Sequence, residues 1–305
     1  NIDFFSVDYQ LIRSMSGSSI QNNQLQQWKD AAIASPGFSE FVQETLALTK
    51  RLFIQLQRRP STLAAGIVQP LMWLILFGAL FQNVPQGLFG DSVNYGQFIG
   101  AGIIVFTAFG GALNAGLPVM FDREFGFLNR LLVAPLVSRF SIVIASALFI
   151  AAMSLVQTAA IVILSAFLGA GLPSIAGLGL MTAIILMLVL GVTAFSLGLA
   201  FALPGHIELI AVIFVTNLPL LFASTALVPL SFMPRWLGAI ASLNPLSYAI
   251  EPIRYLYLHN DWSFSSIVMQ APWGDISMGM SLLLLVGFCG GALALTYPLI
   301  NRRIA

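Results

Sequence analysis

Long apolar stretches dominate the chain from residue 60 onward. Asp, Glu, Lys and Arg are absent from residues 60–90, 92–121, 140–207, 209–234 and 276–301. A helix needs about 20 apolar residues to cross a hydrocarbon core of ~30 Å. The longest stretch has room for two such helices, because its turn residues Gly-Ala-Gly-Leu-Pro-Ser at 169–174 divide it. The pattern therefore predicts an all-α polytopic membrane protein with six transmembrane helices.

The six predicted spans cover residues 61–81, 97–119, 140–168, 175–203, 207–230 and 276–300. Proline lies inside two of them, at Pro70 and Pro219. Each proline removes a backbone donor, so we expect a kink at both positions.

The residues before the first span divide into two parts. Residues 1–37 are polar and rich in Gln, Asn and Ser, which predicts a polar cytoplasmic tail. In residues 38–58, apolar and polar side chains recur with helical periodicity. Phe41 falls on the apolar face, and Lys50 and Arg51 fall on the polar face. This pattern predicts an amphipathic interfacial helix, an elbow before the membrane domain at 59–305. The alternative is a surface helix packed on a soluble domain.

The positions of Lys and Arg predict the orientation. Eleven of the thirteen basic residues fall on one side of the predicted spans: six before residue 60, three between residues 121 and 140, and two at the C-terminus. Only Arg235 and Arg254 fall on the other side. Because cytoplasmic loops carry the excess of Lys and Arg, both termini are expected in the cytoplasm.

Composition excludes several functions. The chain is 58% hydrophobic and 8% charged, whereas soluble proteins carry roughly a quarter charged residues. Its net charge of +1 provides no field to recruit nucleic acid. Neither its one cysteine nor its two histidines form a cluster with metal-ligand spacing. It has no G-x-x-x-x-G-K-[ST] phosphate loop, so we expect no ATPase activity from this chain alone and no cofactor bound to it.

A short loop between the second and third predicted spans is the first candidate site. Residues 121–140 read FDREFGFLNRLLVAPLVSRF, with apolar residues at helical spacing up to Pro135. We expect a short amphipathic helix that transmits force from a soluble partner; the alternative is a surface loop without a partner. The candidate coupling residues are Asp122, Arg123, Glu124, Phe125, Leu128, Asn129, Arg130 and Leu131.

Residues 231–259 form the second candidate site, an extracellular gate. Asn244-Pro245 separates two helical pieces that are too short to span, which predicts a re-entrant helical hairpin. Asn244 and Tyr248 are expected near the axis of a dimer or at its external mouth, where Asn can cap a helix and Tyr can meet headgroups. Glu251 and Arg254 are three residues apart and can pair on one helical face, at the outer rim. That pair fits either a gate or a structural salt bridge.

These segments together resemble a permease subunit of the ABC-2 transporter family, of the drug-exporter branch. The resemblance covers about residues 38–303. It rests on the amphipathic elbow, on Asp122-Arg123-Glu124 followed by Leu132-Val133-Ala134-Pro135, on the end of the fifth span through Pro229, Phe232 and Pro234, and on Asn244-Pro245-Leu246-Ser247-Tyr248 before Ile253-Arg254. The polar N-terminal tail is similar to that of permeases from cyanobacteria and plastids.

The resemblance implies an exporter of amphipathic drugs, lipids or glycans in a prokaryotic inner membrane or an equivalent plastid membrane. Two permease chains, identical or related, would pair with separate ABC ATPase subunits that hold ATP and Mg. By family analogy the first, second and fifth spans would line the pathway between the two chains, and our candidates for its polar or kinked lining positions are Gln69, Asn217 and Pro219. The alternatives are an ion- or proton-coupled secondary transporter, with Glu208 as a candidate carboxylate, and a structural membrane scaffold. A secondary transporter requires ionisable groups near the membrane centre, and the spans lack them.

Overall fold

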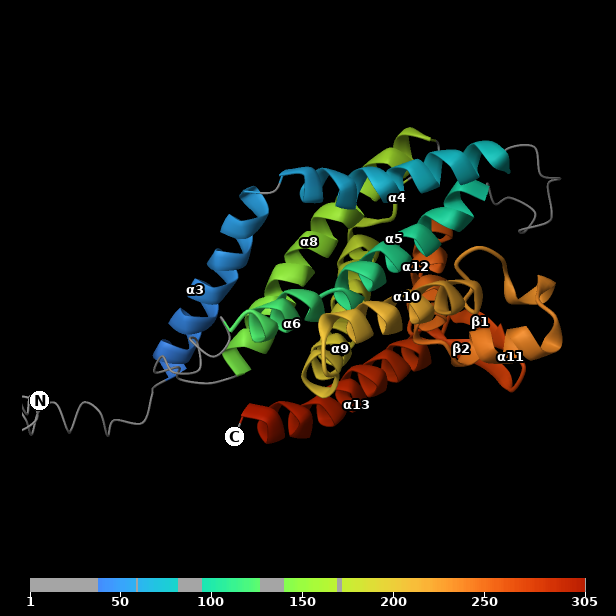
Figure 1. Cartoon of the computed structure of the whole chain (residues 1–305). Helices are drawn as coiled ribbons and strands as arrows, with labels where there is room; N and C mark the ends of the chain where they lie inside the picture. The colour runs from blue at the N-terminus through green and yellow to red at the C-terminus, as the bar shows by residue number, and fades with distance from the viewer. Residues whose placement is uncertain (1–37, 59, 82–94, 127–139, 169–171, 305) are drawn as a thin grey trace, which may run out of the picture.

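The computed structural model describes residues 38–58, 60–81, 95–126, 140–168 and 172–304. These residues form a helical bundle with one two-stranded antiparallel sheet (Figure 1). The helices are α3 (Phe38–Gln57), α4 (Pro60–Leu80), α5 (Tyr95–Leu113), α6 (Gly116–Glu124), α8 (Phe140–Phe167), α9 (Ile175–Ala202), α10 (His206–Phe222), the 3₁₀ turn η1 (Leu230–Phe232), α11 (Arg235–Leu243), α12 (Pro245–Leu258) and α13 (Met278–Ile304).

Four helical segments are long and apolar enough to cross a membrane among the described residues: Phe98–Glu124, Ser141–Phe167, Ile175–Ala202 and Met278–Leu299. Two shorter apolar helices, Ala64–Leu80 and His206–Phe222, correspond to the first and fifth predicted spans. The helix predicted over 38–58 is present as α3, which ends one residue earlier, at Gln57. The polar tail lies outside the described residues.

The second predicted span, at 97–119, is present as the apolar segment Phe98–Glu124, but a turn divides this segment into two helices. The chain turns at Asn114 and Ala115, and α6 continues after the turn as a separate helix. The hydroxyl of Ser196 in α9 donates to the carbonyl of Leu113 at 2.6 Å and accepts from the N–H of Gly116 at 2.9 Å. Because both backbone groups gain a partner from another helix, the break leaves them satisfied inside an apolar bundle.

The fifth predicted span, at 207–230, was too long. Helix α10 ends at Phe222, although apolar residues continue beyond it. The Nδ2 group of Asn244 donates to the carbonyls of Leu220 and Ala223, at 2.8 and 2.5 Å. These carbonyls lie at the end of the helix and have no partner in a following turn, so a side chain about 20 residues downstream completes the terminus.

The expectation of a purely helical fold also needs correction. Strands β1 (Ile267–Ala271) and β2 (Gly274–Ser277) form a hairpin before α13, with Ala271 opposite Gly274. Gly274 has φ = +139°, a conformation that an L side chain rarely adopts. The last helix therefore begins at Met278 rather than at residue 276.

Helix α9 lies at the centre of the bundle and contacts α5, α6, α8, α12 and α13. Its residues Ile184, Ile185 and Leu188 are fully buried. Small residues let α13 approach closely: a Cβ on Gly198 would stand 2.8 Å from Oγ1 of Thr296. That hydroxyl donates to the carbonyl of Ala194 at 2.8 Å, so packing and a hydrogen bond join the two helices.

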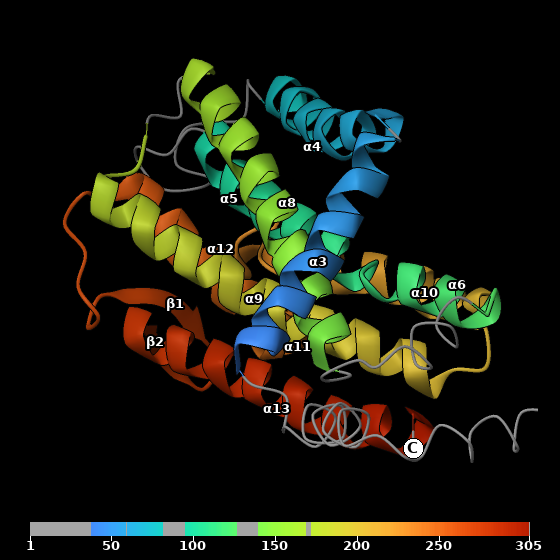
Figure 2. The ribbon, with the colours of Figure 1, turned by 90° about the vertical axis from the view of Figure 1, so that its left-hand side faces the viewer.

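Different helices and strands lie at the two ends of the bundle. Figure 1 shows α11 and the β1–β2 hairpin at the right, and the C-terminal end of α13 and the start of α3 at the left. Figure 2 looks at that second end, where α3 lies across the bundle and packs mainly against α8. Phe53 of α3 meets Phe149 of α8 edge to face, with ring centroids 5.1 Å apart.

Candidate functional site

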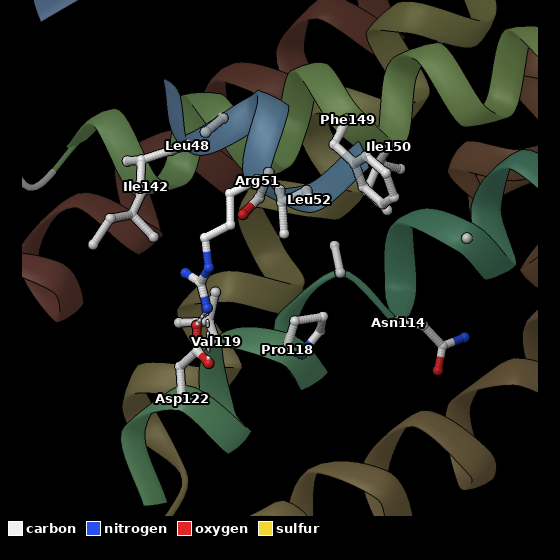
Figure 3. Close-up of a pocket in the computed structure, with 14 residues that line it drawn as sticks. Leu48, Arg51, Leu52, Asn114, Pro118, Val119, Asp122, Ile142, Phe149 and Ile150 are labelled. Atoms are coloured by element: carbon white, nitrogen blue, oxygen red, sulfur yellow. Dashed lines mark hydrogen bonds and ion pairs between the residues drawn. The ribbon is translucent and has the colours of Figure 1, made fainter. Parts of the chain in front are cut away.

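The end of α6 is tied to the elbow helix by an ion pair. The Nη2 atom of Arg51 in α3 lies 3.1 Å from Oδ2 of Asp122 in α6. Both side chains are about 30% exposed. In Figure 3 the two groups point toward each other across the space between the helices. Lys50 is exposed and Phe41 is half-buried, so of the three predicted elbow residues Arg51 is the one placed against α6.

The next residue, Arg123, joins α6 to the end of α9. Its guanidinium donates to the carbonyls of Ala200, Leu203 and Pro204 at 2.8, 2.7 and 2.6 Å. These carbonyls lie at the C-terminal end of α9, where backbone acceptors lack helical partners and the helix dipole favours a cation. Arg123 therefore acts as a side-chain cap for a helix that lies about 80 residues further along the chain.

Glu124, the last residue of α6, binds the start of α10. One of its carboxylate oxygens accepts from the backbone N–H of His206 at 2.6 Å, and the other contacts Nδ1 of that histidine. The ring of His206 also lies against Phe121, with centroids 5.2 Å apart. A carboxylate at a helix N-terminus complements the positive end of the helix dipole. No pattern in the sequence indicated this contact, because Glu124 and His206 lie about 80 residues apart in different predicted loops.

Three successive residues of α6 thus hold three different elements. Asp122 holds α3, Arg123 holds α9 and Glu124 holds α10; we call these three residues the α6 cluster. They lie at the C-terminal end of α6, and most of the amphipathic helix predicted between residues 121 and 135 lies outside the described residues. Phe125 follows as the non-helical cap and is 79% exposed. The predicted coupling residues Leu128, Asn129, Arg130 and Leu131 lie outside the described residues.

A cleft of ≈ 440 Å³ lies between α4, α5, α8 and α10. Gln69 and Asn217, two of the three predicted pathway residues, both line it, although they are far apart in the sequence. Pro219 lies on α10 but is not part of the lining, and its side chain is exposed. A second cavity of ≈ 130 Å³ lies beside the Arg51–Asp122 pair, and four residues line both spaces: Gly111, Asn114, Phe149 and Ile150 (Figure 3).

The predicted gate segment has the expected helical pieces but different surroundings. Asn244 caps α12 by accepting from the N–H of Leu246 at 2.9 Å, and Pro245 begins that helix. Tyr248 is only 8% exposed and its hydroxyl donates to the carbonyl of Ser242, so it does not face headgroups. The expected contact of Tyr248 with headgroups was wrong, because the second piece packs against α5, α9 and α13.

The predicted pair of Glu251 and Arg254 is present, with Oε1 and Nη1 2.6 Å apart. It does not lie at an outer rim, since Arg254 is 5% exposed. The guanidinium stands 3.6 Å from the centre of the Phe98 ring and donates to the carbonyls of Phe98 and Thr225. Arg254 therefore joins α12, the start of α5 and the turn after α10. Of the two alternatives in the sequence, this geometry favours the structural salt bridge.

The long apolar helices define the chain as an integral membrane protein. The model of the ABC-2 type transporter family matches residues 43–258. The chain belongs to this family.

Named relatives agree with that assignment. A protein named transport permease ycf38 from Porphyra purpurea is 58% identical over 253 residues, which cover 82% of this chain and 87% of the relative. Its counterpart from Cyanophora paradoxa is 54% identical over 270 residues, or 88% and 92% of the two chains. A protein of Mycobacterium tuberculosis named as the doxorubicin resistance ABC transporter permease DrrC is 29% identical over 226 residues, or 70% and 76% of the two chains.

Proposed function

We propose that this chain is the membrane subunit of an ATP-driven exporter that works with a separate ABC ATPase subunit. The exporter would move an amphipathic drug-like, lipid or glycan substrate out of the cytoplasm. Membership of the ABC-2 type transporter family supports this proposal. The name of the mycobacterial relative, which refers to doxorubicin resistance, supports an amphipathic substrate.

The observation that carries the proposal is the α6 cluster. An ATPase that docks beside the end of α6 would pull on Asp122, Arg123 and Glu124 together. Through their partners, the displacement would reach the elbow helix, the end of α9 and the start of α10. Helix α10 also carries Asn217, which lines the cleft. The chain thus has a continuous set of contacts from the proposed docking site to the proposed substrate space.

The cleft supports an ATP-driven mechanism over a secondary transporter. Its lining among the described residues contains no Asp, Glu, Lys, Arg or His. Coupling to an ion or proton gradient usually relies on ionisable groups within the membrane. The carboxylate of Glu208, considered from the sequence, lies at the start of α10, away from this lining.

The assembly is proposed to contain two permease chains, identical or related, and two ATPase subunits that bind ATP and Mg. The likeness to ycf38 proteins supports a plastid or prokaryotic inner membrane as the location. Both termini would face the cytoplasm, on the side of the ATPases.

The decisive experiment is reconstitution of the chain with its ATPase in vesicles. We expect the two to copurify, and ATP to drive uptake into inside-out vesicles of an amphipathic probe such as doxorubicin. An ion or proton gradient without ATP should drive no more uptake than it does in vesicles without the protein. Uptake that follows the gradient and ignores ATP would exclude the proposed function and favour the secondary transporter.

A further inference from the structure

Pro70 divides α4 into two parts that are held differently. The part after Pro70 is anchored in the core: Leu74 is 1% exposed, and Trp73 and Phe77 pack against the buried residues of the bundle. The part before it, residues 60–69, has no buried residue among those whose burial the structure describes. Helix α4 also lies at the margin of the bundle, where it contacts α3, α5 and α8 (Figures 1 and 2). The first part of α4 therefore has little apolar packing to hold it in place.

A hydrogen bond from α8 compensates for the proline. In an unbroken α-helix the N–H of residue 70 would pair with the carbonyl of Gly66, four positions earlier, but proline has no N–H. The side-chain amide of Gln157 in α8 donates to that carbonyl instead, with Nε2 and the oxygen 2.9 Å apart. A Cβ built on Gly66 would stand 2.9 Å from the same Nε2 atom, so a larger residue there would displace the amide. Gly66, Pro70 and Gln157 therefore fit together as one unit.

The place of this hydrogen bond allows it to open. Gly66, Pro70 and Gln157 all line the cleft. Water in the cleft can therefore pair with both groups when the bond breaks, which avoids the cost of leaving a carbonyl unpaired in lipid. The first part of α4 is also the part joined to the elbow, since only two residues separate it from α3. A movement of the elbow, which Arg51 ties to α6, would reach this part of α4 first.

We propose that α4 is hinged at Pro70, and that its first part swings away from α8 when the hydrogen bond between Gln157 and Gly66 breaks. In the structure this bond is made, and the first part of α4 forms a wall of the cleft beside α8. The swing widens the cleft between these two helices. The inference goes beyond the proposed function, because it concerns a movement within one chain and holds for any cargo and any energy source.

Spin labels on α4 and α8 measure this movement in the full chain in lipid nanodiscs. One label is placed by Ala65→Cys in the first part of α4, or by Ala79→Cys in the second part. The reference label is placed by Ile144→Cys on α8; all three wild-type side chains are exposed. Cys289→Ser removes the only cysteine of the chain. Double electron–electron resonance then gives the distance distribution of each pair.

Gln157→Met keeps the approximate length of the side chain but cannot donate to Gly66. For the labels at positions 65 and 144, it should raise the ratio of longer to shorter distances roughly three- to tenfold, the effect of one lost hydrogen bond. The distances between positions 79 and 144 should stay unchanged, because the second part of α4 is anchored. Unchanged distances between positions 65 and 144, or equal shifts of both pairs, would overturn the proposal.

Met153→Leu is the matched control. Met153 lies on the same helix and lines the same cleft, but its side chain cannot donate a hydrogen bond to α4. Both distance distributions should match those of the parent protein. A shift as large as that of Gln157→Met would show that any change in the lining loosens α4, and would refute the role of the hydrogen bond.

Restoring the missing N–H tests the hinge itself. Pro70→Ala lets α4 pair the carbonyl of Gly66 within the helix, so its first part no longer depends on Gln157. Gln157→Met should then change the distances between positions 65 and 144 much less than it does beside Pro70. An equal effect in the two backgrounds would show that Gln157 acts without the proline, and would refute the hinge.

Discussion

The hydroxyl of Ser196 lies 2.9 Å from the backbone nitrogen of Gly116, across the contact between α9 and α6. The approach is so close that a Cβ built on Gly116 would stand 2.5 Å from the backbone oxygen of Ser196. Glycine is therefore needed at this position for packing, and Ser196 is needed to pair the backbone groups released at the break between α5 and α6. The break in turn positions the α6 cluster.

Gly116→Ala should destabilise the protein by about 1–3 kcal/mol, because the added methyl group forces the backbones of α6 and α9 apart. Thermal unfolding of the purified protein in detergent would measure this as a lower Tm. Gly179→Ala on α9 is the control, since a Cβ there meets nothing within 4 Å. Equal Tm values for the two variants would show that the contact has no energetic consequence.

Charge reversal tests the ion pair between the elbow and α6. Arg51→Asp places two carboxylates together and should uncouple ATP hydrolysis from transport, while the unfolding free energy changes by about 1 kcal/mol or less at this partly exposed site. Adding Asp122→Arg restores an opposite pair and should restore much of the coupling. The measurement is the ratio of transport to hydrolysis in reconstituted vesicles. A double variant no better coupled than Arg51→Asp would argue against a role for the pair.

The Asn244 amide accepts a hydrogen bond that caps α12 and donates two hydrogen bonds to the end of α10. The substitution Asn244→Asp separates these two roles. Aspartate can still cap α12 through its oxygen, but it cannot donate to the carbonyls of Leu220 and Ala223. Its negative charge would also oppose the C-terminal end of α10. We expect a loss of about 1–3 kcal/mol in the free energy of unfolding, measured by thermal unfolding.

The control for this change is Ser174→Asp. Ser174 caps α9 by accepting from the N–H of Gly177 at 3.1 Å, and an aspartate there can do the same. Its Tm should stay near that of the unmodified protein. If both aspartates were tolerated equally, the donors of Asn244 would be dispensable.

Arg254→Lys keeps the charge of the buried cation but removes the planar group that lies over Phe98 and reaches Thr225. We expect a marked loss of stability, about 2–4 kcal/mol, because Glu251 and two carbonyls lose partners inside the protein. Arg235→Lys on the exposed surface of α11 should change little. Comparable Tm values for the two lysine variants would contradict the structural role of Arg254.

Cysteine labelling tests the proposed orientation in a protein carrying Cys289→Ser. Phe125→Cys, at the end of α6, should be protected from a membrane-impermeant maleimide added outside intact cells. Trp273→Cys, in the β1–β2 turn at the other end of the bundle, should be labelled. Both wild-type side chains are more than half exposed. The reverse labelling pattern would invert the predicted topology.

Much of the local structure follows from the sequence. The periodicity of residues 38–57 predicted α3, and the lack of charges predicted the apolar helices. Asn244-Pro245 predicted the break between α11 and α12, and the spacing of Glu251 and Arg254 predicted their pairing. Each of these features depends on neighbours a few residues apart, for which helical periodicity and proline geometry are sufficient guides.

The sequence by itself thus determined a polytopic helical membrane protein of the ABC-2 type, together with most of its helix positions. The tertiary structure decided the rest: the break between α5 and α6 that Ser196 pairs, the end of α10 that Asn244 completes, the burial of Arg254, and the meeting of Gln69 and Asn217 in one cleft. The reason is physical. Inside an apolar bundle every backbone group at a helix end must find a partner, and here those partners come from side chains about 20 to 80 residues away.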